Sequence, residues 1–252
     1  MTSPITQAPS QTSGPRLWQV QVAAGLGGFL ASVNTSAMNI ALPSVSRHFD
    51  ASASSASWTL LSYMLVTTVL VFVFGRVADL IDRRRLYLAG IAVLTAASLL
   101  CALAPGIEWL IVFRCMQAVG AAALLCNITA LITDAFPAHR LATALGTNTT
   151  IAALAQVIGP ALGGALTSGF GWRAVFWFNV PIGLIGLLWA LRRLRPSAAR
   201  SGRESFDYLG AALSVLALGG LILALSEGGA LGWTSVPVLV GLGLFAAFTP
   251  FS

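Results

Sequence analysis

Long apolar stretches recur along almost all of this 252-residue chain, separated by short polar segments. Each is close to the ~20 residues that an α-helix needs to cross the hydrocarbon core of a bilayer. Hydrophobic residues make up 57% of the sequence and charged residues only 9%. Because backbone polar groups in lipid must be paired within the spanning segment, the pattern predicts an all-α polytopic membrane protein. Continuous apolar runs, without ten-residue alternation, argue against a transmembrane barrel.

The apolar runs also predict how the chain is divided. Residues 1–16 are polar and typical of a disordered cytoplasmic tail. Residues 17–191 hold six expected helices, residues 192–206 form a basic linker, and residues 207–252 hold one complete further helix and part of another. The expected helices are 20–43, 57–75, 86–104, 108–133, 141–168, 172–191 and 207–226, followed by an apolar run at 236–252 that the chain end cuts off.

The formal charge of +6 is a signal of membrane orientation. Arginine supplies the basic charge, and with the N-terminus inside, nearly all arginines outside the spans fall in cytoplasmic segments. Only Arg47 and Arg173 fall on the other side. This asymmetry predicts a multi-pass protein of the plasma (inner) membrane with a cytoplasmic N-terminus. The basic charge is therefore not read as a nucleic-acid surface.

A charge-dense segment, 75–85, separates the second and third expected helices. It resembles the signature loop of the major facilitator superfamily of transporters, Gly-x-x-x-Asp-x-x-Gly-Arg-Arg. The matching residues are Gly75, Asp79, Arg83 and Arg84, whereas Asp82 stands at the second glycine. The resemblance implies a gating loop in which Asp79 pairs with a cytoplasmic arginine, with Arg83, Arg84 and Arg140 as candidates. The alternative is that these arginines only anchor the loop to anionic lipid.

A second motif lies in the fourth expected helix, where Arg114 and Gln117 are three residues apart and share one helix face. It resembles the superfamily element Arg-x-x-Gln-Gly-x-Gly-Ala-Ala. An arginine inside a span is costly unless it faces protein or a wet cavity. We therefore expect Arg114, Gln117 and Asn34 to face a substrate or ion pathway on the inner face of the six-helix half, lined by helices 1, 2, 4 and 5. The alternative is that Arg114 extends to the outer headgroups.

A third motif, in the fifth expected helix, resembles the Gly-Pro-x-x-Gly-Gly element of the antiporter branch of the superfamily. It consists of Gly159, Pro160, Gly163 and Gly164. Proline bends a helix, and glycines permit close approach of a neighbouring backbone. We expect this face to pack against a helix of a second transporter half. The alternative is ordinary small-residue packing.

Two further elements resemble signatures of the fourteen-helix drug:proton antiporters within the superfamily. The matching residues are Asn39 and Pro43 in the first, and Trp172, Arg173, Asn179 and Pro181 in the second. The first element departs at Asn34, where that group carries aspartate. Since an amide cannot titrate, and none of the eight acidic residues is expected at mid-membrane depth, the sequence does not predict proton coupling through this half.

The resemblance implies the six-helix N-terminal half of a major facilitator fold, plus one full and one partial additional transmembrane helix. Because alternating access requires two halves, the chain is expected to be incomplete without a C-terminal half. A truncated transporter and a half that assembles with itself or another polypeptide both remain open.

The implied function is efflux of drug-like or other small molecules by a secondary antiporter, driven by a transmembrane ion gradient, with protons as the expected ion. The alternative is a non-transporting membrane scaffold that keeps the half fold. No enzyme motif is present, His48 and His139 are expected in separate loops, and the three cysteines lack metal-ligand spacing. No cofactor, metal or nucleic-acid partner is predicted; the expected partners are the bilayer and a small-molecule substrate.

Overall fold

A computed structural model describes the six-helix part of the chain and isolated positions beyond it. The described residues are 14–194, 220, 235–236, 239–241 and 243, and within them the side chains at 14–16, 76–77 and 79–80 are left out. The expected tail, the basic linker and nearly all of the two additional helices lie outside the described residues. The domain boundaries predicted there stay predictions.

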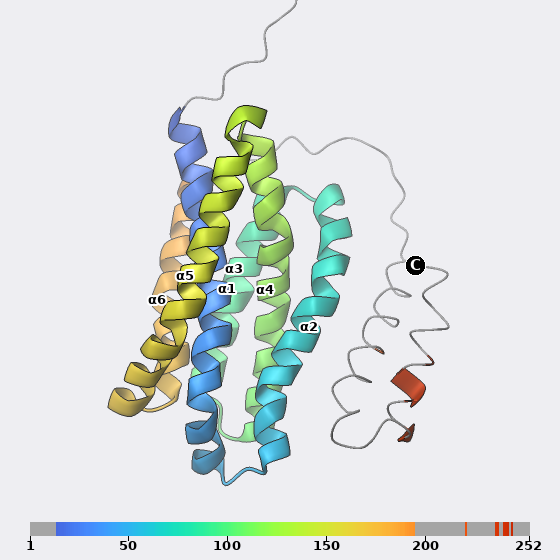
Figure 1. Ribbon diagram of the computed structural model, residues 1–252, viewed down its shortest axis with the longest axis vertical. Helices are drawn as coiled ribbons and strands as arrows, with labels where there is room; N and C mark the ends of the chain where they lie inside the picture. The colour runs from blue at the N-terminus through green and yellow to red at the C-terminus, as the bar shows by residue number, and fades with distance from the viewer. Residues whose placement is uncertain (1–13, 195–219, 221–234, 237–238, 242, 244–252) are drawn as a thin grey trace, which may run out of the picture.

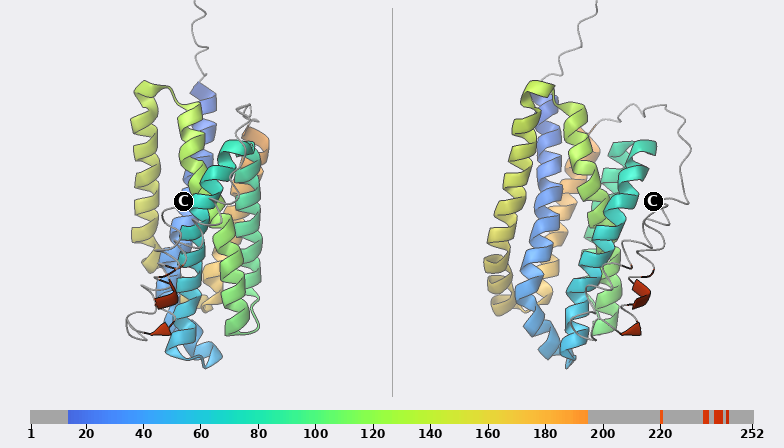
Figure 2. Two further views of the ribbon diagram at one scale, coloured as in Figure 1. Left: turned by 90° about the vertical axis from the view of Figure 1, so that its right-hand side faces the viewer. Right: turned by 45° about the vertical axis from the view of Figure 1, so that its right-hand side comes forward.

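Six long helices run up and down along one axis and form a single bundle (Figure 1). In Figure 1, α1 and α4 lie in the middle, with α5 and α6 to one side and α2 to the other. Two further views show that the helices lie side by side along this common axis (Figure 2). The helices are α1 (Gly14–Phe49), α2 (Ala53–Leu80), α3 (Arg83–Ala102), α4 (Ile107–Ala135), α5 (Ala138–Phe170) and α6 (Arg173–Arg193).

The six expected helices are confirmed, and most of them extend beyond their apolar runs. The largest correction concerns the charged segment expected as a loop, since α2 continues to Leu80 and only Ile81 and Asp82 separate it from α3. Backbone hydrogen bonds do not require apolar side chains, so a helix can continue past the hydrocarbon boundary. His48 and His139 likewise lie near helix ends, in α1 and α5, and not in loops.

Asp82 explains how so short a turn is accommodated. Its side chain caps α3 by accepting a hydrogen bond from the Arg84 backbone N–H at 3.1 Å. Aspartate is a favoured N-cap because it satisfies an amide that the first helical turn leaves unpaired. The residue that departs from the superfamily glycine therefore starts the helix and keeps the turn tight.

Of the helices that the structure describes, five are long and apolar enough to cross a membrane, namely α2 to α6. The first helix, α1, is outside this set, and polar side chains interrupt its apolar sequence between Asn34 and Asn39. Yet α1 is closely surrounded by protein, since Asn34, Ala37 and Met38 are completely buried. Its polar residues therefore face other helices, which removes much of the cost of placing them at membrane depth.

Small residues let the helices approach closely. A Cβ added to Gly120 of α4 would lie 2.7 Å from the Gly90 carbonyl oxygen of α3. The Gly183 and Gly186 positions of α6 meet Thr95 and Ile91 of α3 in the same way. Such contacts matter in lipid, where close van der Waals packing drives helix association.

The glycine face of α5 is used inside this bundle. A Cβ on Gly163 would lie 2.6 Å from the Ala37 carbonyl oxygen of α1, and one on Gly159 would collide with the Ser36 hydroxyl. The Ser36 hydroxyl also donates to the Ala155 carbonyl oxygen across the same pair of helices, at 3.4 Å. The expectation that this face packs against a second transporter half is therefore wrong for Gly159 and Gly163.

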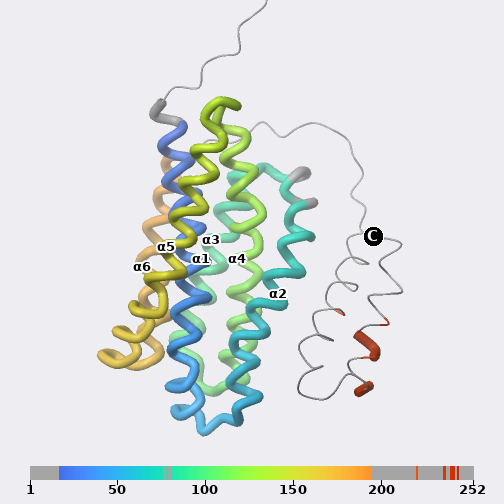
Figure 3. Tube along the Cα trace, in the orientation of Figure 1, coloured from blue at the N-terminus to red at the C-terminus, as the bar shows by residue number. Residues whose placement is uncertain are grey.

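The tube in Figure 3 follows the alternating direction of the six helices. The start of α1, both turns α2–α3 and α4–α5, and the end of α6 lie at one end of the bundle. The arginines separate accordingly, as the sequence predicted. This end carries Arg83, Arg84, Arg85, Arg140, Arg192 and Arg193, and the opposite end carries Arg47 and Arg173.

Candidate functional site

The candidate site is centred on Arg114 of α4, whose side chain is completely buried. Its Nε donates to the Thr59 carbonyl oxygen of α2 at 3.0 Å, and its Nη1 donates to Gln117 Oε1 at 2.7 Å. The guanidinium lies over the ring of Tyr63, with Cζ 4.2 Å from the ring centroid. Arg114 therefore faces protein on all sides, which excludes the alternative of an arginine extending to the headgroups.

Asn34 of α1 brings two further helices into this network. Its Oδ1 accepts from Arg114 Nη1 at 3.3 Å and from Nδ2 of Asn179 in α6 at 3.2 Å. Gln117 in turn donates to the Ser98 hydroxyl of α3 at 2.7 Å. One connected network thus reaches α1, α2, α3, α4 and α6, and we call it the Arg114 network: Asn34, Thr59, Tyr63, Ser98, Arg114, Gln117 and Asn179.

The charge of Arg114 is balanced in an unusual way. Among the residues that the structure describes, the guanidinium contacts carbonyl and amide oxygens and the faces of two aromatic rings. None of these groups carries a formal negative charge. Dipoles and ring faces solvate a cation only partly, so the site keeps a net positive charge in a low-dielectric interior.

The three residues expected together, Asn34, Arg114 and Gln117, do lie together. They lie inside the six-helix bundle, however, whereas we expected them on an open inner face. All three have no exposed surface. Which helices line a pathway, and whether these side chains belong to it, stay predictions.

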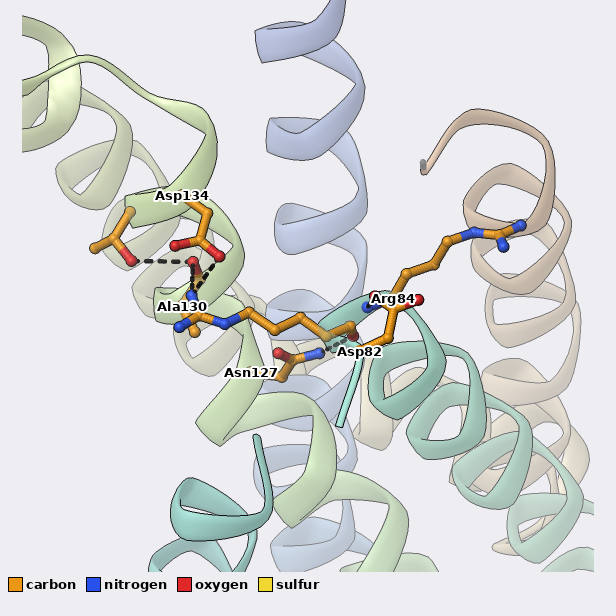
Figure 4. Close-up of polar contacts among 7 residues, drawn as sticks. Asp82, Arg84, Asn127, Ala130 and Asp134 are labelled. Carbon is orange, nitrogen blue, oxygen red and sulfur yellow. Dashed lines mark hydrogen bonds and ion pairs between the residues drawn. The ribbon is translucent and has the colours of Figure 1, made fainter. Parts of the chain in front are cut away.

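The charged turn between α2 and α3 is attached to the end of α4 (Figure 4). Arg83 Nη1 donates to Asp134 Oδ2 at 2.7 Å and to the Ala130 carbonyl oxygen at 2.6 Å. Asn127 donates its side-chain amide to the Arg83 carbonyl oxygen. These contacts define the Arg83 anchor: Arg83, Asn127, Ala130 and Asp134.

The other residues that match the signature of the charged segment are Gly75, Asp79 and Arg84. Arg84 donates to the Leu191 carbonyl oxygen of α6 at 3.0 Å, which joins the turn to a third helix. Gly75 lies within α2, and a Cβ there would meet nothing within 4 Å. The side chain of Asp79 lies outside the described residues, so its expected pairing with an arginine stays a prediction.

Two residues of the second drug-antiporter signature, Trp172 and Arg173, lie at the opposite end of the bundle, whereas its Asn179 belongs to the Arg114 network. Arg173 stacks on Trp172, with Cζ 4.5 Å from the ring centroid, and donates to the Ala104 carbonyl oxygen at 3.0 Å. Its Nη1 lies 3.0 Å from His48 Nε2, so that ring nitrogen accepts. Arg173 thus joins the ends of α1, α3 and α6. Asn39, Pro43 and Pro181 are exposed on their helices and outside both networks, and Pro160 is half-buried within α5.

Comparison with known proteins agrees with this architecture. A family model described as Major Facilitator Superfamily matches residues 24–251. The chain belongs to this superfamily. The multidrug resistance protein Stp of Mycobacterium tuberculosis (strain CDC 1551 / Oshkosh) is 38% identical over 222 residues, which cover 88% of this chain and 41% of Stp. The riboflavin transporter RibZ of Clostridioides difficile (strain 630) is 31% identical over 212 residues, covering 84% of this chain and 46% of RibZ.

This major facilitator chain spans less than half the length of these two curated relatives. A solved structure agrees at the level of fold. The inward-facing, unoccupied form of a bacterial homologue of the human lysosomal transporter Spinster has a TM-score of 0.63 and 22% sequence identity. The match covers 94% of this chain and 60% of that one. The fold of this chain is thus found in a solved transporter structure.

Several members of both networks could not be found from the sequence. Thr59 contributes through its backbone carbonyl, for which no side-chain signal exists. Ser98 lies in an apolar helix, and Asp134 lies 51 positions beyond Arg83, at the end of another helix. The available signal was that Asp134 and Arg83 flank turns on the same side of the membrane, which predicts proximity but no particular pair.

Proposed function

We propose that this chain forms the N-terminal half of a membrane exporter of small organic molecules that works by alternating access. The observation that best supports this proposal is the complete burial of Arg114, which joins α1, α2 and α4 through direct hydrogen bonds. A charge at membrane depth is retained at a cost, which makes it a functional candidate by default. Because its partners come from several helices, a change at Arg114 acts on the whole half.

Two lines of support bear on the kind of transport. Stp is named a multidrug resistance protein, and RibZ is named a riboflavin transporter. One name refers to drugs and the other to riboflavin, which is an organic molecule. We therefore propose drug-like or other small organic molecules as the substrate class, and a secondary antiporter of the fourteen-helix group as the type. Superfamily transporters work through two halves that move about a central site, so the partner in this proposal is a C-terminal half.

The proposed membrane is the bacterial plasma membrane, with the N-terminus in the cytoplasm. The support is the segregation of arginines to the end of the bundle that carries the start of α1. Positive residues are concentrated in cytoplasmic segments because they are retained on that side during insertion. Cysteine labelling at positions near Arg85 and near Arg47, in intact cells, tests this orientation.

Efflux of ethidium from pump-deficient cells tests the transport proposal. The chain is expressed alone, and together with the C-terminal half of a full-length homologous exporter, at matched membrane levels. We expect gradient-dependent efflux only for the pair. Arg114→Gln should reduce it to the level of the empty vector, because the network then loses its charge and its fork of donors.

Arg193→Gln is the matched control, because Arg193 is an exposed arginine at the end of α6 outside the Arg114 network. This variant should retain efflux. Full activity of the Arg114→Gln pair would contradict the role of Arg114. Stable association of the two halves without any efflux would favour a membrane scaffold instead.

A further inference from the structure

We propose that Arg114 and Asn34 form the donor pair of a binding site for a small monovalent anion. The anion is either an inorganic halide such as chloride or a small carboxylate such as acetate. This inference concerns binding to the chain itself and does not depend on transport. It rests on unused donors, on the orientation of one amide, and on the missing negative charge.

The guanidinium of Arg114 has unused donors at one defined atom. An arginine side chain carries five N–H donors. Nε uses one on Thr59, and Nη1 bonds to both Asn34 and Gln117. Nη2 is buried and has no hydrogen-bond partner. Both of its N–H groups are therefore left without an acceptor, in a setting where each unmet donor costs about 1–3 kcal/mol.

Asn34, which accepts a hydrogen bond from the same guanidinium, supplies a second unused donor. Its oxygen faces Arg114 Nη1 at 3.3 Å and also accepts from Asn179. Turning the amide over would place its NH₂ against two donors, so the assignment of oxygen and nitrogen is determined by the network. Asn34 Nδ2 is consequently buried with no partner of its own. Two orphan donors thus belong to two side chains that are hydrogen-bonded to each other.

The charge of the site points the same way. No carboxylate of the described residues lies within salt-bridge distance of Arg114, and the ion pair described above joins Asp134 to Arg83. Burying an unpaired ion costs several kcal/mol, and an opposite charge with hydrogen-bond acceptors offsets that cost. An anion would supply both the acceptors for Nη2 and Nδ2 and the missing charge. A cation would be repelled, and guanidinium groups suit carboxylates and other small anions.

All three polar residues at the centre are completely covered, so an anion can enter only when helices part. Binding is therefore measured at equilibrium, through its effect on thermal stability. The purified 252-residue chain is melted in detergent, following tryptophan fluorescence, in sodium gluconate that is replaced stepwise by sodium chloride at constant ionic strength. A parallel series uses sodium acetate. Gluconate is the reference because it is much larger than chloride or acetate, the two small anions under test.

We expect the Tm of the wild-type chain to rise by about 5 °C when the small anion reaches about 100 times its Kd. A rise with chloride alone identifies a halide site, and a rise with acetate as well identifies a site that also takes carboxylates. The Asn34→Asp variant carries its own carboxylate beside Arg114. Its Tm in gluconate should be higher than that of the wild type, and it should no longer respond to chloride or acetate.

Two arginine variants complete the test. Arg114→Gln should lose the anion response, and Arg193→Gln should keep it. If Arg114→Gln fails to fold, Asn34→Asp still decides the matter, since it retains every donor of the guanidinium. A wild-type Tm that is indifferent to both anions would overturn the proposal. So would an Asn34→Asp variant with an undiminished response, because that would mark a general salt effect.

Discussion

Two arginines of this bundle, Arg114 and Arg83, differ in burial and in the charge of their partners. Arg114 lies in the interior with no exposed surface and is held by neutral oxygens and an aromatic ring. Arg83 lies at the end of the bundle, is 14% exposed, and pairs with Asp134, which is 36% exposed. The first is an uncompensated charge in a dry setting, and the second is an ion pair that water reaches.

The difference teaches that the contribution of an arginine to stability depends on how deeply its side chain is buried, and not on the residue type alone. Near the surface, water and salt weaken an ion pair, so its net contribution is small. In the interior, every polar contact is stronger, and every missing contact costs more. The Arg114 network should therefore dominate both stability and function, whereas the Arg83 anchor should tune the position of one turn.

The largest expected effect is at Arg114. Arg114→Ala leaves acceptors of Thr59, Gln117 and Asn34 without their donor and opens a cavity, so the free energy of unfolding should fall by about 3 kcal/mol. Thermal melting in detergent at constant salt measures this change. The matched substitution Arg83→Ala should lower stability much less. Equal losses of stability in the two variants would contradict the proposed difference between the buried arginine and the arginine at the end of the bundle.

The next effect concerns backbone contact in the interior. Gly120→Ala places a Cβ within 2.7 Å of the Gly90 carbonyl oxygen, so α3 and α4 must separate. Overpacking of this kind costs about 2 kcal/mol. The control is Gly146→Ala in α5, where the new Cβ meets nothing within 4 Å. That variant should be as stable as the wild type or slightly more stable, because alanine favours a helix over glycine. Similar melting curves for both alanine variants would contradict the close α3–α4 contact.

A smaller effect is expected at the cap of α3. Asp82→Ala removes the acceptor of the Arg84 backbone N–H, and the stability should fall by about 1 kcal/mol. Asp82→Asn keeps a capping oxygen and should behave like the wild type. Hydrogen exchange at the first turn of α3 provides a local readout of the same change. If the asparagine variant loses as much as the alanine variant, the carboxylate acts through its charge and not as a cap.

The smallest effect is expected for the ion pair of the Arg83 anchor. A double-mutant cycle of Arg83→Gln and Asp134→Asn should give a coupling free energy of about 0.5 kcal/mol, because both side chains reach water. Raising the salt concentration from about 0.1 M to about 1 M should reduce it further. A coupling free energy larger than the effect at Arg114, or one that does not change with salt, would show that the Arg83 anchor contributes more to stability than the Arg114 network.

The sequence predicted a large part of this fold for a simple physical reason. A bilayer requires apolar helices of a minimum length, so apolar runs reveal how many helices there are. Helix ends were less well predicted, because the helices continue into polar residues at the membrane boundary. The turn at Asp82 shows this, since a residue that departs from the family pattern still begins a helix as an N-cap.

The candidate site was predicted in part. Arg114, Gln117 and Asn34 stood out because polar residues are rare and costly within apolar spans. The network that they form with residues of three further helices, including the backbone oxygen of Thr59, depends on contacts between residues far apart in the chain. Likewise the glycines of α5 indicated close packing, but their partner proved to be α1.

The sequence by itself determined the number of helices in this half, the end of the bundle that carries most arginines, and the residues whose burial would be costly. These properties follow from local hydropathy and charge, which each segment carries wherever it packs. Only the tertiary structure decided that Arg83 pairs with Asp134, that α5 lies against α1, and that Arg114 has neutral partners and two unused donors. Those features depend on which helix faces align, and alignment is set by packing between distant segments.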